Sequence, residues 1–111
     1  MTVEQKGEVV FTKAGPNSVK SDEGFWVEVL GMAGILYREG EREIRVNSEL
    51  MMKGKRAGIV VYSNSIKAWN PLYDSEAINA DKKGRIVDNI RRAFQFKGWV
   101  VEVIELYDGP W

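Results

Sequence analysis

The segment from Ile35 to Val46 constrains the fold of this chain more than any other, because its residues match as the two arms of a β-hairpin. With Gly40-Glu41 as a two-residue turn, glycine occupies the first central position, as a type II′ turn requires. A slip of one residue would break the cross-strand matching and turn the side chains to the wrong face. The sequence therefore predicts both the hairpin and its register, with four matched pairs: Glu39–Arg42, Arg38–Glu43, Tyr37–Ile44 and Ile35–Val46.

Three further apolar segments have the composition of strands. They run from Phe25 to Leu30, from Gly58 to Tyr62 and from Trp99 to Leu106. The second is an almost continuous aliphatic run, which is typical of a central strand covered on both faces. Just before it, residues 47–57 combine Leu50-Met51-Met52 with basic side chains. We interpret residues 47–57 as a loop or one helical turn.

The first 24 residues contain one short apolar run, Val9-Val10-Phe11, among glycine, proline, asparagine and serine. Residues of these polar and small types favour turns. We therefore expect an N-terminal strand followed by a turn-rich loop, with residues 1–24 forming a loosely ordered segment.

A helix is predicted between about residues 81 and 97. Ile86, Ile90 and Phe94 repeat every four residues and form an apolar stripe on one face. Asn79 is suited to cap the N-terminus of this helix, and Gly98 is placed to end it. Strands followed by a late helix and one more strand predict an α+β fold. We expect one domain, residues 1–111, with an antiparallel or mixed sheet, the helix packed on one face, and a final strand.

The chain contains no histidine and no cysteine. It therefore lacks the commonest general base, the commonest metal ligand and the thiol nucleophile. Zinc and most transition metals would have to be held by carboxylates alone. These absences predict a binding protein with no cofactor, no metal and no catalytic activity, and the missing cysteine suits a reducing compartment.

Two constellations could still carry chemistry. Ser63 and Lys67 lie close enough in sequence for a Ser/Lys dyad, although Ser63-Asn64-Ser65 also has the composition of an ordinary strand end. Glu102 and Glu105 could form a carboxylate pair for glycoside hydrolysis, but an odd spacing within one strand directs them to opposite faces. The structural interpretation is favoured for both.

Sixteen basic and sixteen acidic side chains give a formal net charge of zero. Net charge therefore argues against a general attraction to nucleic acid or to an anionic membrane. No apolar run approaches the ~20 residues that span a bilayer, and the first residues lack the apolar core of a signal peptide. We expect a cytoplasmic protein.

Charges are distributed unevenly along the chain, because residues 81–97 carry six basic and two acidic side chains. A basic helix face beside an aromatic could bind a nucleic-acid strand, which is the alternative function. A solvated face of paired charges would need no partner at all. Tryptophan and tyrosine with acidic neighbours in the loop before the helix are typical of a protein interface, although Trp69 could also anchor that loop. The candidate partner-binding residues are Trp69, Tyr73, Asp74, Glu76, Arg85, Arg92 and Phe96.

Several short motifs occur together in one order along the chain: Ile35-Leu36-Tyr37-Arg38-Glu39-Gly40, Ile44-Arg45-Val46, Ile59-Val60-Val61-Tyr62, Ser65-Ile66-Lys67-Ala68-Trp69 and Arg85-Ile86-Val87-Asp88-Asn89-Ile90. In this order the chain resembles the immunity protein 74 family of bacterial polymorphic toxin systems, from about Ile35 to Val103. The resemblance does not cover the first 34 residues.

The resemblance implies a function in contact-dependent inhibition. An immunity protein is made beside a secreted or surface-delivered toxin and binds its C-terminal toxin domain in the cytoplasm of the producer. Such a function implies a cognate protein toxin as the partner, with no cofactor and no reaction. Whether the chain also associates with itself is left open by the sequence.

Overall fold

The computed structural model describes residues 10–15, 17–31 and 34–105 of the chain. In these ranges it contains eight strands, one α-helix and a short 3₁₀ helix. In chain order they are β1 (Phe11–Gly15), β2 (Ser18–Ser21), β3 (Phe25–Val29), β4 (Ile35–Glu39), β5 (Arg42–Val46), β6 (Ser48–Lys53), β7 (Arg56–Tyr62), η2 (Ser63–Ser65), α1 (Ala80–Phe96) and β8 (Val100–Ile104).

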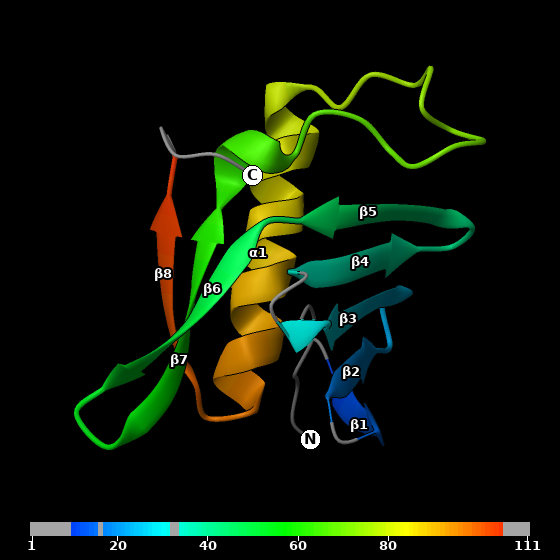
Figure 1. The fold of residues 1–111 in the computed structure, drawn as a ribbon. Helices are drawn as coiled ribbons and strands as arrows, with labels where there is room; N and C mark the ends of the chain where they lie inside the picture. The colour runs from blue at the N-terminus through cyan, green and yellow to red at the C-terminus, as the bar shows by residue number, and fades with distance from the viewer. Residues whose placement is uncertain (1–9, 16, 32–33, 106–111) are drawn as a thin grey trace.

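The strands form two sheets. Strands β1 to β5 make an antiparallel sheet in chain order, and β6, β7 and β8 make a smaller mixed sheet with β7 in the centre. Figure 1 shows the two sheets on either side of α1, with the chain passing from β5 directly into β6. The predicted α+β class is confirmed, and the sheet types that the sequence left open, antiparallel and mixed, both occur.

The predicted hairpin is confirmed residue by residue. Strands β4 and β5 pair in the expected register, from Glu39 opposite Arg42 to Ile35 opposite Val46. Gly40 has φ +58°, and no described residue other than glycine has a positive φ. A positive φ at the first central position alone is the signature of a type II′ turn.

The interpretation of residues 47–57 as a loop or helical turn is wrong, because Ser48–Lys53 form strand β6. This strand pairs antiparallel with β7, from Ser48 opposite Val61 to Lys53 opposite Arg56. Gly54 has φ +62°, so Gly54-Lys55 repeats the glycine-first turn of the other hairpin. Leu50 and Met52 are exposed, so β6 lacks the alternation of buried and polar residues that marks most strands.

The N-terminal prediction is confirmed only in part. A strand is present as β1, but it begins at Phe11, the last residue of the expected apolar run, and Val10 lies outside it. The prediction of a turn-rich loop after the strand is wrong for Ser18–Ser21, which form β2. In β2, Val19 faces the core opposite Val27 of β3, and this burial outweighs the turn propensity of the two serines. Residues 1–9 of the same segment lie outside the described residues.

Helix α1 begins and ends where the sequence predicted, to within one residue. The Asn79 side chain accepts a hydrogen bond from the Lys82 backbone N–H at 2.8 Å, and Gly98 follows the helix with φ +83°. The helix carries the crossover between the parallel strands β7 and β8, which cannot be joined by a tight turn. The final strand is confirmed as β8; Leu106, its predicted end, lies outside the described residues.

The core lies between α1 and the inner faces of both sheets. The helix contributes its predicted apolar stripe, and it contacts β8 of the smaller sheet as well as β2 and β3 of the larger one. Tyr37 is fully buried in this core, and its hydroxyl accepts a hydrogen bond from the Asn89 side chain at 2.9 Å. Burial raises the pKa of Tyr37 well above its usual value, so the phenol stays protonated.

Candidate partner-binding site

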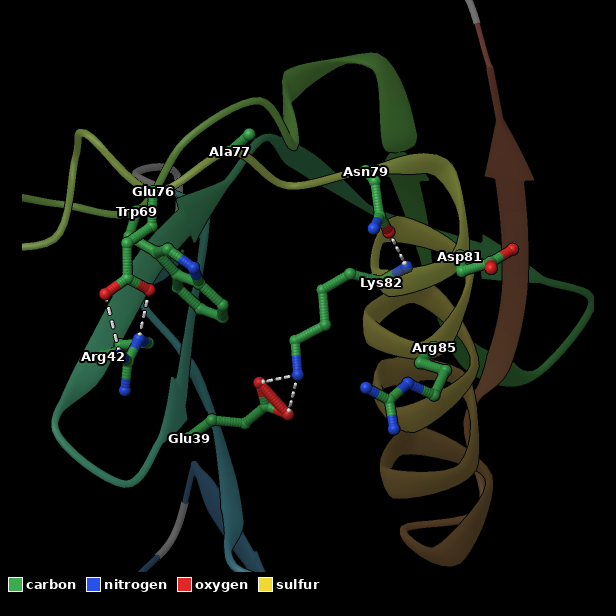
Figure 2. Close-up of a pocket in the computed structure, with 9 residues that line it drawn as sticks. All are labelled: Glu39, Arg42, Trp69, Glu76, Ala77, Asn79, Asp81, Lys82 and Arg85. Atoms are coloured by element: carbon green, nitrogen blue, oxygen red, sulfur yellow. Dashed lines mark hydrogen bonds and ion pairs between the residues drawn. The ribbon is translucent and has the colours of Figure 1, made fainter.

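A charged cleft of about 690 Å³ opens at one end of α1. Three segments form it: the end of the β4–β5 hairpin, the connecting loop (residues 66–79) and the first two turns of the helix (Figure 2). The lining combines charged side chains with one tryptophan and consists of Glu39, Arg42, Trp69, Glu76, Ala77, Asn79, Asp81, Lys82 and Arg85.

Backbone hydrogen bonds hold the connecting loop against the hairpin, although the loop itself contains no strand or helix. Ala68 and Ala77 form an isolated antiparallel bridge that closes it. The Asn70 N–H donates to the Glu43 carbonyl at 2.7 Å, which uses the outer edge of β5. The N–H of Tyr73 and that of Glu76 close two successive turns at 3.0 Å each. The loop is therefore an ordered wall of the cleft.

The first ion pair of the cleft joins the hairpin to this loop. Arg42 donates from Nε and Nη2 to the two carboxylate oxygens of Glu76, at 2.7 and 2.8 Å. These hydrogen bonds lower the pKa of Glu76 below its usual value. The same guanidinium lies 4.5 Å from the centre of the Tyr73 ring, and the Tyr73 hydroxyl donates to Glu41 at 2.7 Å. That last bond raises the pKa of Tyr73.

The second ion pair joins the hairpin to the helix. The Lys82 ammonium lies 2.6 and 2.8 Å from the two carboxylate oxygens of Glu39, and the two side chains are only 27% and 26% exposed. Figure 2 shows both ion pairs spanning the cleft from different elements. Together they bind the helix, the hairpin and the loop to one another.

Two exposed charged side chains of the cleft take no part in these ion pairs. Among the described residues, neither Arg85 nor Asp81 has a side-chain hydrogen bond or ion pair, and Figure 2 shows the Arg85 side chain extending from α1 beside the Glu39–Lys82 pair. An exposed guanidinium offers five N–H donors in a planar arrangement. These two side chains are free to bind groups of another molecule.

The structure brings four of the predicted site residues together at the cleft and places the other three elsewhere. Trp69, Glu76 and Arg85 line the cleft, and Tyr73 packs against it through Arg42. Asp74 is exposed farther along the loop. Arg92 and Phe96 lie two to three turns farther along α1, where Arg92 pairs with Asp88 and Glu23 and Phe96 packs on Phe11.

Trp69 forms the buried floor of the cleft. Its side chain is 4% exposed and belongs to the hydrophobic core, with the Lys82 ammonium 5.9 Å from the ring centre. This burial matches the anchoring role that the sequence offered for Trp69 and leaves little area for a partner. Three residues of the cleft were not among the predicted site residues: Arg42, Lys82 and Glu39. The hairpin register predicted from the sequence already places Glu39 opposite Arg42.

The two catalytic alternatives lack the geometry they need. Ser63 is buried, with its hydroxyl 3.1 Å from Glu105 Oε1, whereas Lys67 is exposed, and no hydrogen bond joins the two. Glu102 binds Lys53, and Glu105 binds Lys83 on the helix, so the two carboxylates serve separate ion pairs. Within the described ranges, no cluster of three or more carboxylates could hold a metal ion. Nor is any helix there long and apolar enough to cross a membrane.

Comparison with known proteins identifies one family. The family model described as immunity protein 74 matches residues 27–104, which include the hairpin, the connecting loop and all of α1. No curated protein and no solved structure matches the chain.

Proposed function

The chain belongs to the immunity protein 74 family, and from this premise we propose that it neutralises a cognate bacterial toxin by direct contact. The contact surface that we assign consists of the charged cleft and the exposed part of the connecting loop, and the toxin would be met in the cytoplasm of the producing cell. Inhibition by contact needs an ordered surface rather than a reactive group, so no cofactor and no reaction enter the proposal.

The strongest support for this assignment is that the surface is already ordered in the isolated chain. The Arg42–Glu76 and Glu39–Lys82 pairs hold the loop, the hairpin and the helix in place. A surface that is ordered before binding loses less conformational entropy when a partner binds, and this raises affinity.

An apolar contact group lies on the same loop. The Leu72 side chain is 88% exposed, and it neighbours Tyr73, whose ring packs on Arg42. Large apolar and aromatic side chains at the centre of an interface commonly contribute most of the binding energy, while charges at its rim govern encounter rate and partner choice. Leu72 and Tyr73 would fill the first role, and Arg85 and Asp81 the second.

The charge of the surface indicates the kind of toxin it suits. Inhibitors of strongly basic active sites usually present an acidic surface. On this surface Glu39 and Glu76 are each paired with a basic side chain of this chain. The surface is therefore mixed in sign, which favours a toxin surface with both charges over a strongly basic nuclease groove.

The nucleic-acid alternative is less well supported. At least four of the six basic side chains between residues 81 and 97 form ion pairs within the chain, which leaves the helix face largely neutralised. Binding to nucleic-acid phosphates gains most of its free energy when unpaired basic side chains of the protein displace counterions from the nucleic acid. The paired charges thus favour a protein partner.

We predict that Leu72→Lys and Arg85→Glu each weaken toxin binding about tenfold or more, because each removes a contact group and adds an unfavourable charge. The measurement is the Kd for the toxin encoded by the adjacent gene, together with survival of cells that express both proteins. Both substitutions alter exposed side chains, so the unfolding midpoint should remain close to that of the parent chain.

Lys20→Glu is the matched control, because Lys20 is exposed on the larger sheet, away from the cleft. It changes charge as much as Arg85→Glu does, and it should leave both Kd and protection unchanged. Unaltered toxin binding by the Leu72 and Arg85 variants would refute the assignment of the surface. Absence of any binding to the adjacent toxin by the parent chain would refute the function itself.

A further inference from the structure

The outer edge of β6 carries backbone groups that no strand in the described part of the chain pairs with. Strand β6 pairs only with β7 in the three-stranded sheet. The Tyr62 N–H donates to the Asn47 carbonyl at 3.0 Å, which shows that Asn47 bonds toward β7. Because the bonding direction alternates along an antiparallel strand, Glu49, Met51 and Lys53 also bond toward β7. The N–H and C=O groups of Leu50 and Met52 therefore point to the free edge.

The side chains at this edge are unusually apolar for an exposed strand. Leu50 and Met52 are 54% and 64% exposed, and the β6–β7 hairpin projects past the helix in Figure 1. Natural proteins normally protect an apolar edge strand with charges, bulges or covering segments, since such an edge pairs readily with another strand. An unprotected edge of this kind is a site for strand addition.

The sequence of β6 is complementary to itself in the antiparallel direction. It reads Glu49-Leu50-Met51-Met52-Lys53, with opposite charges at the ends and three apolar residues between them. If two copies meet with Met51 opposite Met51, each Glu49 faces a Lys53 and each Leu50 faces a Met52. Opposite charges and apolar groups that face each other across strands stabilise the pairing.

We propose that β6 pairs with β6 of a second copy of this chain in this register. The two three-stranded sheets then join into one six-stranded sheet across a two-fold axis. The pairing uses the backbone groups of Leu50 and Met52, which are the ones that point outward. Lys53 already binds Glu102 at 2.8 Å, but an ammonium has three donors and can also bind the Glu49 carboxylate of the second copy.

Neighbouring registers and other edges fit less well. A shift of one residue would place the outward backbone groups of one copy opposite groups of the other copy that already bond to β7. A shift of two residues would separate Glu49 from Lys53.

The edges of the other strands offer less. The outer edge of β5 already accepts a hydrogen bond from the Asn70 N–H. In β8, full antiparallel alignment with a second copy would place Glu102 opposite Glu102, which is repulsive. Of the edges of β5, β6 and β8, that of β6 is thus the one whose charges favour a second copy.

Sedimentation of the purified chain without toxin tests the proposal. Over about 1 to 500 µM, we expect a concentration-dependent shift from monomer to dimer. Glu49→Lys places like charges opposite each other twice per dimer and should raise the dissociation constant about tenfold or more. The swap Glu49→Lys with Lys53→Glu restores opposite charges between the two copies, but it also places two carboxylates where Lys53 binds Glu102 in the parent chain. The constant should therefore fall well below that of Glu49→Lys alone, toward the parent value.

Met52→Pro removes one outward N–H and leaves the bonds to β7 intact, so it should abolish the dimer while the unfolding midpoint changes little. Lys20→Glu, on the other sheet, should leave the dimer unchanged. If Met52→Pro does not fold, the single and double charge variants decide alone.

The proposal is overturned if the chain remains monomeric throughout the concentration range, or if the dimer persists unchanged in the Glu49 and Met52 variants. A double swap that does not restore the dimer would reject this register. A monomeric chain whose toxin binding is lost in Met52→Pro would assign the edge to a toxin strand instead. Because the sedimentation measurements contain no toxin, their outcome is independent of the function proposed above.

Discussion

Two glycines illustrate how much a single residue can depend on its surroundings. Gly34 has φ +104°, and a Cβ atom there would lie 2.6 Å from the carbonyl oxygen of Val46. Gly84 lies inside α1 on an exposed surface, and a Cβ atom there would meet nothing within 4 Å. The first glycine is required by backbone geometry, whereas the second only weakens the helix.

We predict opposite effects of alanine at these two positions. Gly84→Ala should raise the free energy of unfolding by about 0.5–1 kcal/mol, because alanine has the higher helix propensity. Gly34→Ala should lower it by more than about 1 kcal/mol, because the left-handed conformation and the contact with Val46 both penalise a Cβ atom. Urea unfolding of the two variants measures both changes, and equal signs would contradict the assignment.

At the scale of elements, one carboxylate joins three segments that are distant in sequence. Glu105, directly after β8, accepts hydrogen bonds from the Lys83 ammonium on α1 at 2.7 Å and from the Ser63 hydroxyl in η2 at 3.1 Å. Lys83 is the larger cause, and the two bonds lower the pKa of Glu105 below its usual value. The last strand is therefore attached to the helix by charge as well as by packing.

The lowered pKa of Glu105 predicts a pH-dependent contribution to stability. A carboxyl group whose pKa is lower in the folded state stabilises the fold above its unfolded pKa, and this contribution is lost as pH falls through the folded pKa. Parent chain and Glu105→Gln should therefore differ in unfolding free energy at about pH 6, and the difference should shrink as the pH falls through the lowered folded pKa of Glu105. Urea titrations at several pH values measure the difference, and a constant gap would argue against the ion pair as its source.

For the whole molecule, α1 is the element that makes two sheets into one structure. The buried residues of both sheets and of the helix form a continuous hydrophobic cluster, in which Ile86 and Ile90 are fully buried. Neither sheet has a core of its own, because each packs its apolar face against the same helix. The protein should therefore unfold as a unit.

Ile90→Ala tests this dependence. Removing buried methyl groups from the shared helix should lower the free energy of unfolding by about 2–5 kcal/mol. Because both sheets pack on the helix, tryptophan fluorescence and far-UV circular dichroism should follow one transition with the same midpoint, before and after the change. Two separate transitions would show instead that the sheets are stable independently.

The elements that could be predicted well from the sequence are those whose interactions join residues close together in the chain. The β4–β5 hairpin follows from facing charges on either side of Gly40, and α1 from its apolar stripe, Asn79 and Gly98. Strand β6 escaped prediction because Leu50 and Met52 are exposed, so burial produces no alternation there. The turn at Gly54 was the local signal that could have revealed it.

The cleft depended on contacts that no local pattern encodes. Arg42 meets Glu76 across 34 positions of the chain, and Lys82 meets Glu39 across 43. The hairpin register, the helix and its cap could be predicted from the sequence, because their contacts join residues close together in the chain. Which charges lie together and which tryptophan is buried could not be predicted, because those properties depend on how α1 packs between two sheets.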